Sequence, residues 1–209
     1  MSFDTIVIDT GLSNIKNILN VCKVLNINFD TTQNINNFKN TKSIILPGVG
    51  SFIEGMRRLK KLDLDGKIID FANSKRPILG ICLGMQLLMN ESEEFGYTKG
   101  LSLIDGKVEK FNKNKVPNIP HIGWNKVDFV NNANKILFYK NTDSSFFYFI
   151  HSFYVNLNKK YPYSTQTKFG ETLFCSSLKV DNIFVTQFHP EKSGSNGIRV
   201  IDNFFKEIL

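Results

Sequence analysis

The chain has 209 residues, of which 42% are hydrophobic, and carries a formal net charge of +7. This length and composition allow one sizeable hydrophobic core, so we expect residues 1–209 to form a single domain. Its apolar runs are shorter than the roughly 20 residues of a membrane-spanning helix. The first residues lack the basic start and apolar run of a secretory signal. We therefore expect a cytoplasmic protein that does not associate with a membrane.

The positive charge does not predict a nucleic-acid partner. Only four of the 26 basic residues are arginines, and the lysines are spread along the chain. Arginine is the favoured reader of phosphates and base edges, whereas dispersed lysines usually form a solvated surface. The three cysteines have no CxxC spacing, and the three histidines have no metal-ligand spacing. We therefore expect no nucleic acid, no disulfide framework, no metal and no cofactor.

The first half of the chain alternates short apolar runs with helical patterns. Strands are predicted at residues 5–9, 27–30, 43–46 and 77–81, and helices at 15–25, 51–60, 65–74 and 82–88. Such an alternation of strands and helices predicts an α/β fold with a largely parallel sheet and helices on both faces.

The second half is richer in β-branched and aromatic residues, which strands prefer. Strands are predicted at residues 106–111, 147–150, 153–155 and 183–188, and a closing helix at 197–208. The segments 112–118, 131–135 and 156–160 are rich in asparagine and lysine and are predicted to be loops.

Cys82 lies in the pattern Gly80-Ile81-Cys82-Leu83-Gly84, directly after a predicted strand and before a predicted helix. This is the thiol version of the nucleophile elbow. The partial positive charge of the helix N-terminus favours a thiolate, and the amide of Leu83 would face a developing oxyanion. The alternative is that the glycines only serve a tight turn and that Cys82 fills space.

His189 and Glu191 lie two residues apart at the end of the last predicted strand. In an extended chain their side chains point the same way, so the carboxylate could orient the imidazole and stabilise its charged form. Cysteine, base and acid together would form a nucleophilic triad. The alternative is that His189 is a structural histidine whose hydrogen bonds are satisfied at the end of the strand, and that Glu191 is a surface charge. His121 and His151 are predicted to support loops.

The segment Pro47-Gly48-Val49-Gly50 follows a predicted strand and precedes a predicted helix. Its glycines permit backbone amides to face a ligand, so it could supply a second oxyanion donor. The alternative is an ordinary glycine-rich turn.

Three segments together resemble the class I glutamine amidotransferases: Leu46–Gly50, Gly80–Gln86 and Phe188–Lys192. Within that class the chain is most similar to the glutaminase subunits of imidazole glycerol phosphate synthase. This closer similarity rests on Ser92-Glu93-Glu94, Gly123-Trp124-Asn125 and His151-Ser152. The resemblance implies a flavodoxin-like open sheet with an added antiparallel β portion.

The resemblance also implies roles for named residues. Cys82 would attack the side-chain amide of glutamine, with His189 as base and Glu191 as its orienter. The amides of Leu83 and of Val49 or Gly50 would form the oxyanion hole. Gln86 and Glu94, with Gly50 nearby, would hold the amino-acid end of glutamine.

The implied partner is a cyclase subunit, a β/α barrel, that forms a heterodimer and uses the ammonia in histidine biosynthesis. The chain departs from the family pattern at Thr10 and Ser13 in the N-terminal loop, at Phe95 and at Phe153. These departures leave open a paralogue that feeds ammonia to another acceptor, for instance in sugar amidination. A silent sensing subunit and a cysteine hydrolase are further alternatives, although a sensor needs no nucleophile and base.

Overall fold

The computed structural model describes residues 4–12, 15–31, 38, 40–130, 137–141 and 145–208. The predicted loop at 131–135 and the departure at Ser13 lie outside these residues.

An eight-stranded sheet forms the centre of the molecule, with the strand order β2-β1-β3-β4-β14-β13-β12-β9. The strands are β1 (Thr5–Val7), β2 (Phe29–Thr31), β3 (Ser43–Gly48), β4 (Ile78–Cys82), β9 (Asp128–Phe129), β12 (Ser164–Phe169), β13 (Thr172–Val180) and β14 (Ile183–Thr186). Pairing is parallel from β2 through β14 and antiparallel from β14 through β9. Every residue of β3 and β4 is buried, as expected for central strands covered on both faces.

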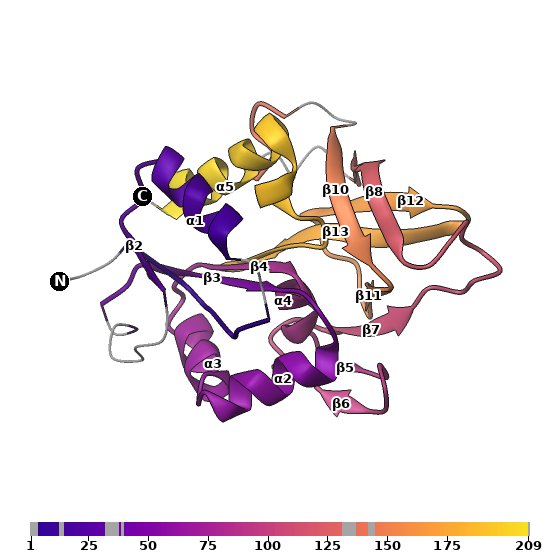
Figure 1. Ribbon diagram of the computed structural model, residues 1–209, viewed down its shortest axis with the longest axis horizontal. Helices are drawn as coiled ribbons and strands as arrows, with labels where there is room; N and C mark the ends of the chain where they lie inside the picture. The colour runs from indigo at the N-terminus through magenta and orange to yellow at the C-terminus, as the bar shows by residue number, and fades with distance from the viewer. Residues whose placement is uncertain are drawn as a thin grey trace.

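Helices cover both faces of the sheet, with α2 and α3 on one face and α1 and α5 on the other (Figure 1). Their bounds are α1 Lys16–Val24, α2 Phe52–Lys61, α3 Asp65–Asn73, α4 Leu83–Leu87 and α5 Gly194–Ile208. Buried positions of α2 recur at helical spacing, at Phe52, Gly55, Met56 and Leu59. No helix among the described residues is both long and apolar enough to cross a membrane.

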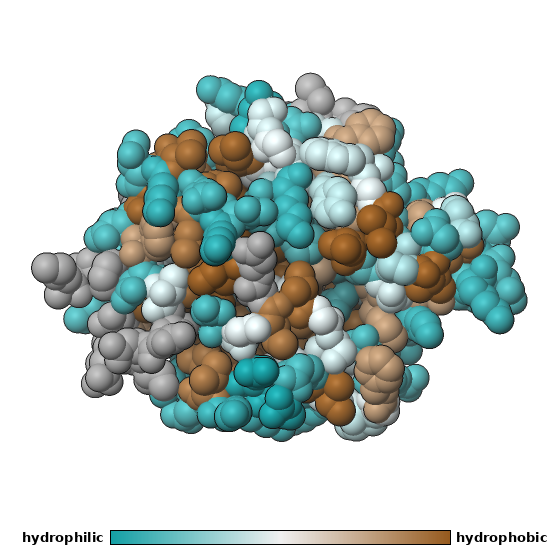
Figure 2. All heavy atoms as spheres, in the orientation of Figure 1, coloured by the Kyte–Doolittle hydropathy of each residue, from teal (hydrophilic) through white to brown (hydrophobic). Residues whose placement is uncertain are grey.

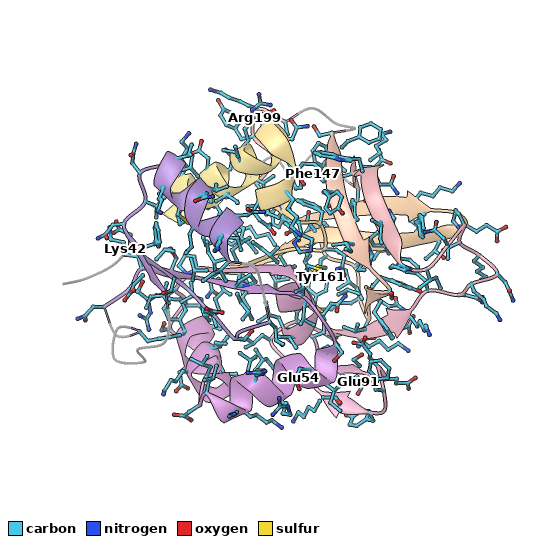
Figure 3. All side chains as sticks on the ribbon, in the orientation of Figure 1. Lys42, Glu54, Glu91, Phe147, Tyr161 and Arg199 are labelled. Carbon is cyan, nitrogen blue, oxygen red and sulfur yellow. The ribbon has the colours of Figure 1, made fainter. Side chains whose placement is uncertain are left out.

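The sheet separates two hydrophobic cores. One lies on the side of α2 and α3 and contains Phe52, Ile68 and Phe71. The other lies on the side of α1 and α5 and is rich in phenylalanine. Phe147, which is fully buried, points into this second core between α5 and β10 (Figure 3).

Two smaller sheets lie beside the main sheet (Figure 1). One is the antiparallel pair of β8 (His121–Lys126) and β10 (Phe146–His151). The other has the order β11-β7-β5-β6, with β5 at Glu91–Ser92, β6 at Thr98–Lys99, β7 at Gly106–Lys110 and β11 at Phe153–Leu157.

The predicted α/β fold with a mostly parallel sheet and an antiparallel portion is confirmed. The boundaries differ in the second half. Strand β11 continues to Leu157, into the predicted loop at 156–160, because its backbone pairs with β7 as far as Gly106. Strand β14 ends at Thr186, two residues before the predicted end. The chain also forms β5, β6, β8, β9, β12 and β13, which were not predicted.

Candidate active site

Cys82 ends β4 and immediately precedes α4, as the elbow pattern predicts. Its backbone has φ 53° and ψ −108°, a conformation that residues other than glycine rarely adopt. Strain of this kind persists where the surroundings fix the conformation, and it is concentrated at functional sites. The turn reverses the chain sharply and leaves the Cys82 thiol at the carboxyl edge of the sheet.

Two glycines make this turn possible by allowing backbone segments to meet. A Cβ atom at Gly84 would lie 1.8 Å from the carbonyl oxygen of Leu46 in β3. A Cβ atom at Gly48 would lie 2.9 Å from Cβ of Leu83. The end of β3 therefore packs directly on the first turn of α4, and this contact fixes the position of Leu83 and its amide.

His189 lies on the chain just beyond β14, and its backbone amide donates to the carbonyl oxygen of Tyr148, at 2.9 Å. Its Nδ1 is 2.8 Å from Oε1 of Glu191, and both side chains are almost fully buried. The prediction that this pair lies on one side of an extended strand was wrong. A 3₁₀ helix at Pro190–Lys192 carries Glu191, and its tight turn brings the carboxylate back to the imidazole.

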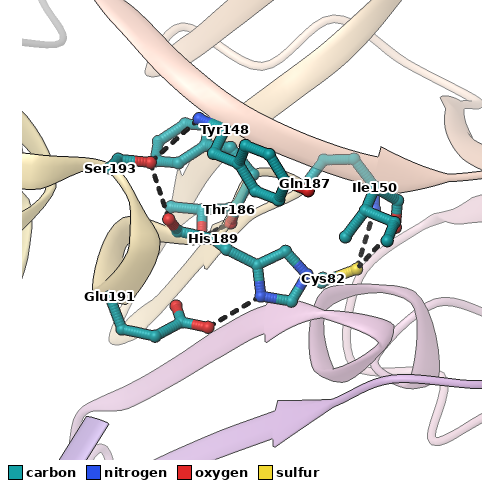
Figure 4. Close-up of polar contacts among 9 residues, drawn as sticks. Cys82, Tyr148, Ile150, Thr186, Gln187, His189, Glu191 and Ser193 are labelled. Atoms are coloured by element: carbon teal, nitrogen blue, oxygen red, sulfur yellow. Dashed lines mark hydrogen bonds and ion pairs between the residues drawn. The ribbon is translucent and has the colours of Figure 1, made fainter. Parts of the chain in front are cut away.

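The other ring nitrogen of His189, Nε2, faces Cys82 (Figure 4) and has no hydrogen-bond partner among the described residues. Burial lowers the pKa of His189, but its interactions with the neighbouring Cys82 and with the Glu191 carboxylate outweigh burial and raise this pKa to about 10. Both neighbours therefore favour the charged form of the imidazole. A carboxylate on Nδ1 also fixes that nitrogen as a donor, which directs Nε2 at Cys82.

A cleft of ≈ 250 Å³ opens beside the sulfur of Cys82. It brings together six of the residues predicted for the site, namely Val49, Gly50, Cys82, Leu83, Gln86 and Glu94. Gly50 has φ +104°, a conformation that favours glycine. His189 and Glu191 instead line a smaller cavity of ≈ 100 Å³ together with Gly48 and Val49.

Glu94 and Gln86 are both buried at the cleft. Oε2 of Glu94 accepts a hydrogen bond of 2.7 Å from the amide of Phe52 at the start of α2. Burial raises the pKa of Glu94, while this hydrogen bond and Lys110 oppose the rise. Nε2 of Gln86 donates to the carbonyl oxygen of Phe153, at 2.9 Å, and to Oε1 of Gln187, at 3.0 Å.

His121 and His151 do not support loops, contrary to the prediction. They face each other across β8 and β10, and Nδ1 of His121 lies 3.1 Å from Nε2 of His151. Nδ1 of His151 is 2.8 Å from the carbonyl oxygen of Phe153, so it must be a donor, and its Nε2 must accept from His121. Burial lowers the pKa of His121 to about 4 and that of His151 to about 3, so both rings are neutral.

Gln187 was not predicted as part of the site. Its fully buried side chain places Nε2 at 3.6 Å from the sulfur of Cys82 (Figure 4). A signal for it was present, because Gln187 lies two residues before His189 at the end of a buried strand, where polar side chains are uncommon.

The fold and the arrangement of cysteine, histidine and glutamate define the class of protein. A family model described as "Glutamine amidotransferase class-I" matches residues 6–208. Solved structures with the same fold include a glutamine amidotransferase, with a TM-score of 0.72 at 14% identity over 97% of both chains. The structure of PurLQS from Thermotoga maritima has a TM-score of 0.72 at 16% identity over 100% of both chains.

Relatives with higher sequence identity identify the family within this class. The chain is 39% identical to imidazole glycerol phosphate synthase subunit HisH of Chlorobium chlorochromatii, over 94% of this chain and 96% of the relative. It is 41% identical to subunit HisH 2 of Methanococcus maripaludis, over 96% of this chain and 98% of the relative. The chain belongs to the HisH family of class I glutamine amidotransferases.

Proposed function

We propose that this protein hydrolyses L-glutamine to glutamate and ammonia and passes the ammonia to a cyclase subunit of imidazole glycerol phosphate synthase, in the cytoplasm. The observation that carries the proposal is the strained elbow that holds the Cys82 thiol beside Nε2 of His189, whose Nδ1 is bound to Glu191. Similarity to curated HisH subunits supports the histidine pathway over another ammonia acceptor.

The charge state of the pair sets the order of proton transfers. With His189 protonated, the Cys82 thiolate attacks the side-chain amide carbon of glutamine without first losing a proton. The imidazolium then gives its Nε2 proton to the leaving nitrogen, which departs as ammonia and leaves a glutamyl thioester on Cys82. The neutral His189 next removes a proton from water, which attacks the thioester and releases glutamate. These steps restore the thiolate and the imidazolium.

The rest of the cleft would bind and polarise the substrate. The amide of Leu83 at the start of α4, with an amide of Val49 or Gly50, would stabilise the oxyanion of each tetrahedral intermediate. Glu94 would pair with the substrate ammonium group. Both hydrogens of the Gln86 amide nitrogen are engaged, so its oxygen is the atom left to accept a hydrogen bond from that same group.

An exposed apolar face beside the site would receive the cyclase. One side of the β8–β10 pair presents the cyclase face, which we define as Ile122, Trp124, Phe146, Tyr148 and Ile150. Four of these five side chains are among the exposed large hydrophobic residues, and Trp124 is 55% exposed. In Figure 2 the surface over this pair of strands combines pale side chains with brown, hydrophobic ones. Exposed aromatic clusters of this kind mark protein interfaces.

The cyclase face is connected to the site through the backbone of β10. The carbonyl oxygen of Ile150 lies 3.9 Å from the sulfur of Cys82. The carbonyl oxygen of Tyr148 accepts from the amide of His189, at 2.9 Å. A partner seated on this face would therefore contact the strand that touches both reacting residues, which supports control of glutamine hydrolysis by the partner.

Glutamate release from glutamine tests the proposal, measured with and without the cyclase subunit of the same organism. Cys82→Ala serves as the blank, since it removes the sulfur and leaves a residue that fits the space. We expect release that the cyclase stimulates and that Cys82→Ala abolishes, with an unchanged circular dichroism spectrum. Substantial release by the variant in the presence of the cyclase would remove Cys82 as the nucleophile.

A further inference from the structure

Gln187 is placed beside the reacting sulfur by the pairing of the central strands. Strand β14 runs parallel to β4, and Thr186 pairs with Ile81. The residues that follow are Gln187, just beyond the end of β14, and Cys82, the last residue of β4. The backbone amide of Gln187 donates to the carbonyl oxygen of Ser176, at 2.8 Å, which fixes the start of its side chain.

The orientation of the Gln187 amide follows from its neighbours. The carbonyl oxygen of Phe153 can only accept, so the atom of Gln86 that lies 2.9 Å from it must be the nitrogen. The second hydrogen of that nitrogen points at Gln187, whose facing atom must therefore be the oxygen, at 3.0 Å. The nitrogen of Gln187 is then the atom that faces Cys82, at 3.6 Å.

Besides His189, two polar groups near the sulfur favour different protonation states of Cys82. The carbonyl oxygen of Ile150, at 3.9 Å, can interact only with a thiol that donates its hydrogen. The nitrogen of Gln187 carries a hydrogen and favours a thiolate that accepts it. A hydrogen bond to a charged group in a buried site is among the stronger ones.

We propose that Gln187 is a positioning residue that holds Cys82 as a thiolate in line with His189, and that Gln86 fixes the orientation in which Gln187 does so. This inference rests on the proposed function, because it assigns a further residue to the same reaction. It adds a second role to Gln86: besides facing the substrate, Gln86 orients the amide that donates to the nucleophile.

Two substitutions of Gln187 distinguish a role in holding the sulfur of Cys82 from a role that only supports the side chain of Gln86. Gln187→Met has a similar length and removes both the donor and the acceptor. Gln187→Glu keeps an oxygen for Gln86 and replaces the donor beside the sulfur with a carboxylate. Thr186→Val is the matched control, since it removes a buried hydroxyl from the adjacent position, where Thr186 donates only to the carbonyl oxygen of Phe188.

The first measurement is the rate at which iodoacetamide alkylates Cys82 at neutral pH, followed by mass spectrometry of the Cys82 peptide and without glutamine or cyclase. We expect both Gln187 variants to react at least about tenfold more slowly than wild type, as for the loss of one hydrogen bond to a charged group. The ultraviolet absorbance of the thiolate should fall in parallel. Thr186→Val should react at the wild-type rate.

The second measurement is glutamate release with the cyclase present. We expect Gln187→Glu to lower kcat by a similar factor and to change KM little, because the contact with Gln86 remains. If folded Gln187→Glu had the same alkylation rate and the same kcat as the wild type, the proposal would be overturned. Gln187 would then only support the side chain of Gln86. Thermal unfolding shows whether each variant is folded. An inactive wild-type protein with the cyclase would instead refute the proposed function.

Discussion

Replacing Gly84 with alanine should open the elbow that presents Cys82. The added Cβ atom would lie 1.8 Å from the carbonyl oxygen of Leu46, whereas such contacts in proteins are at least about 3 Å. The end of β3 and the first turn of α4 would have to separate by more than about 1 Å. Both are backbone segments in a packed core, so neither can rotate away. Overpacking of this kind costs about 3 kcal/mol, or roughly 6–12 °C in melting temperature for a chain of this size.

Thermal unfolding followed by circular dichroism measures this change, with Gly66→Ala as the matched control. Gly66 lies on the exposed side of α3, and a Cβ atom there meets nothing within 4 Å. Alanine at that position should raise stability by up to about 1 kcal/mol through helix propensity. We also expect Gly84→Ala to lose glutamine hydrolysis, since Leu83 and Cys82 move, and Gly66→Ala to retain it. A melting temperature of Gly84→Ala within about 2 °C of wild type would refute this account of the elbow.

Three further predictions concern the charged pair and the cyclase face. His189→Ala should lower the rate of glutamine hydrolysis at least about tenfold more than Glu191→Ala, because His189 is the base and Glu191 only orients it. Equal retention of activity in both variants would refute the triad. In NMR titrations the pKa of His189 should lie near 10 and should fall in Cys82→Ala, because the variant lacks the side chain that raises it; an unchanged value would contradict the pairing. Trp124→Ala should weaken cyclase binding by about 30-fold, measured by calorimetry, whereas Val24→Ala on the far end of α1 should have no effect.

The raised pKa of His189 also predicts how stability depends on pH. Its value of about 10 in the folded chain lies above the usual 6.5. The folded state therefore holds this proton more tightly than the unfolded state does. The stabilisation of the folded state by protonated His189 is fully present below pH 6.5 and is lost as the pH rises through about 10.

The parallel half of the fold could be predicted because its signals are local. Buried strands such as β3 and β4 are continuous apolar runs, and α2 shows helical spacing. The antiparallel half could not be predicted in detail, because strands such as β12 and β13 are held by pairing with distant segments. Strand β12, for example, carries buried Ser164, Thr165 and Thr167, which apolar periodicity does not detect. That residues 1–209 form one domain stays a prediction.

The candidate site was predicted where each residue sits in a recognisable local pattern, as Cys82 and His189 do. The prediction failed where the position of a side chain depends on a tight turn or on a strand that is distant in the sequence. Glu191 reaches His189 through a 3₁₀ turn rather than along a strand. The contact of His151 with His121 and the place of Gln187 beside Cys82 come from strands that pair across the sheets, so no local pattern predicted either contact.

The most direct test of the central claim is to trap the covalent intermediate. The protein is mixed with the cyclase and glutamine, quenched with acid during turnover, digested and analysed by mass spectrometry. We predict one glutamyl group in thioester linkage on the Cys82 peptide, and none on the peptides of Cys22 or Cys175, which are buried away from the cleft. Turnover without an adduct on Cys82, or with an adduct on another residue, would contradict the account.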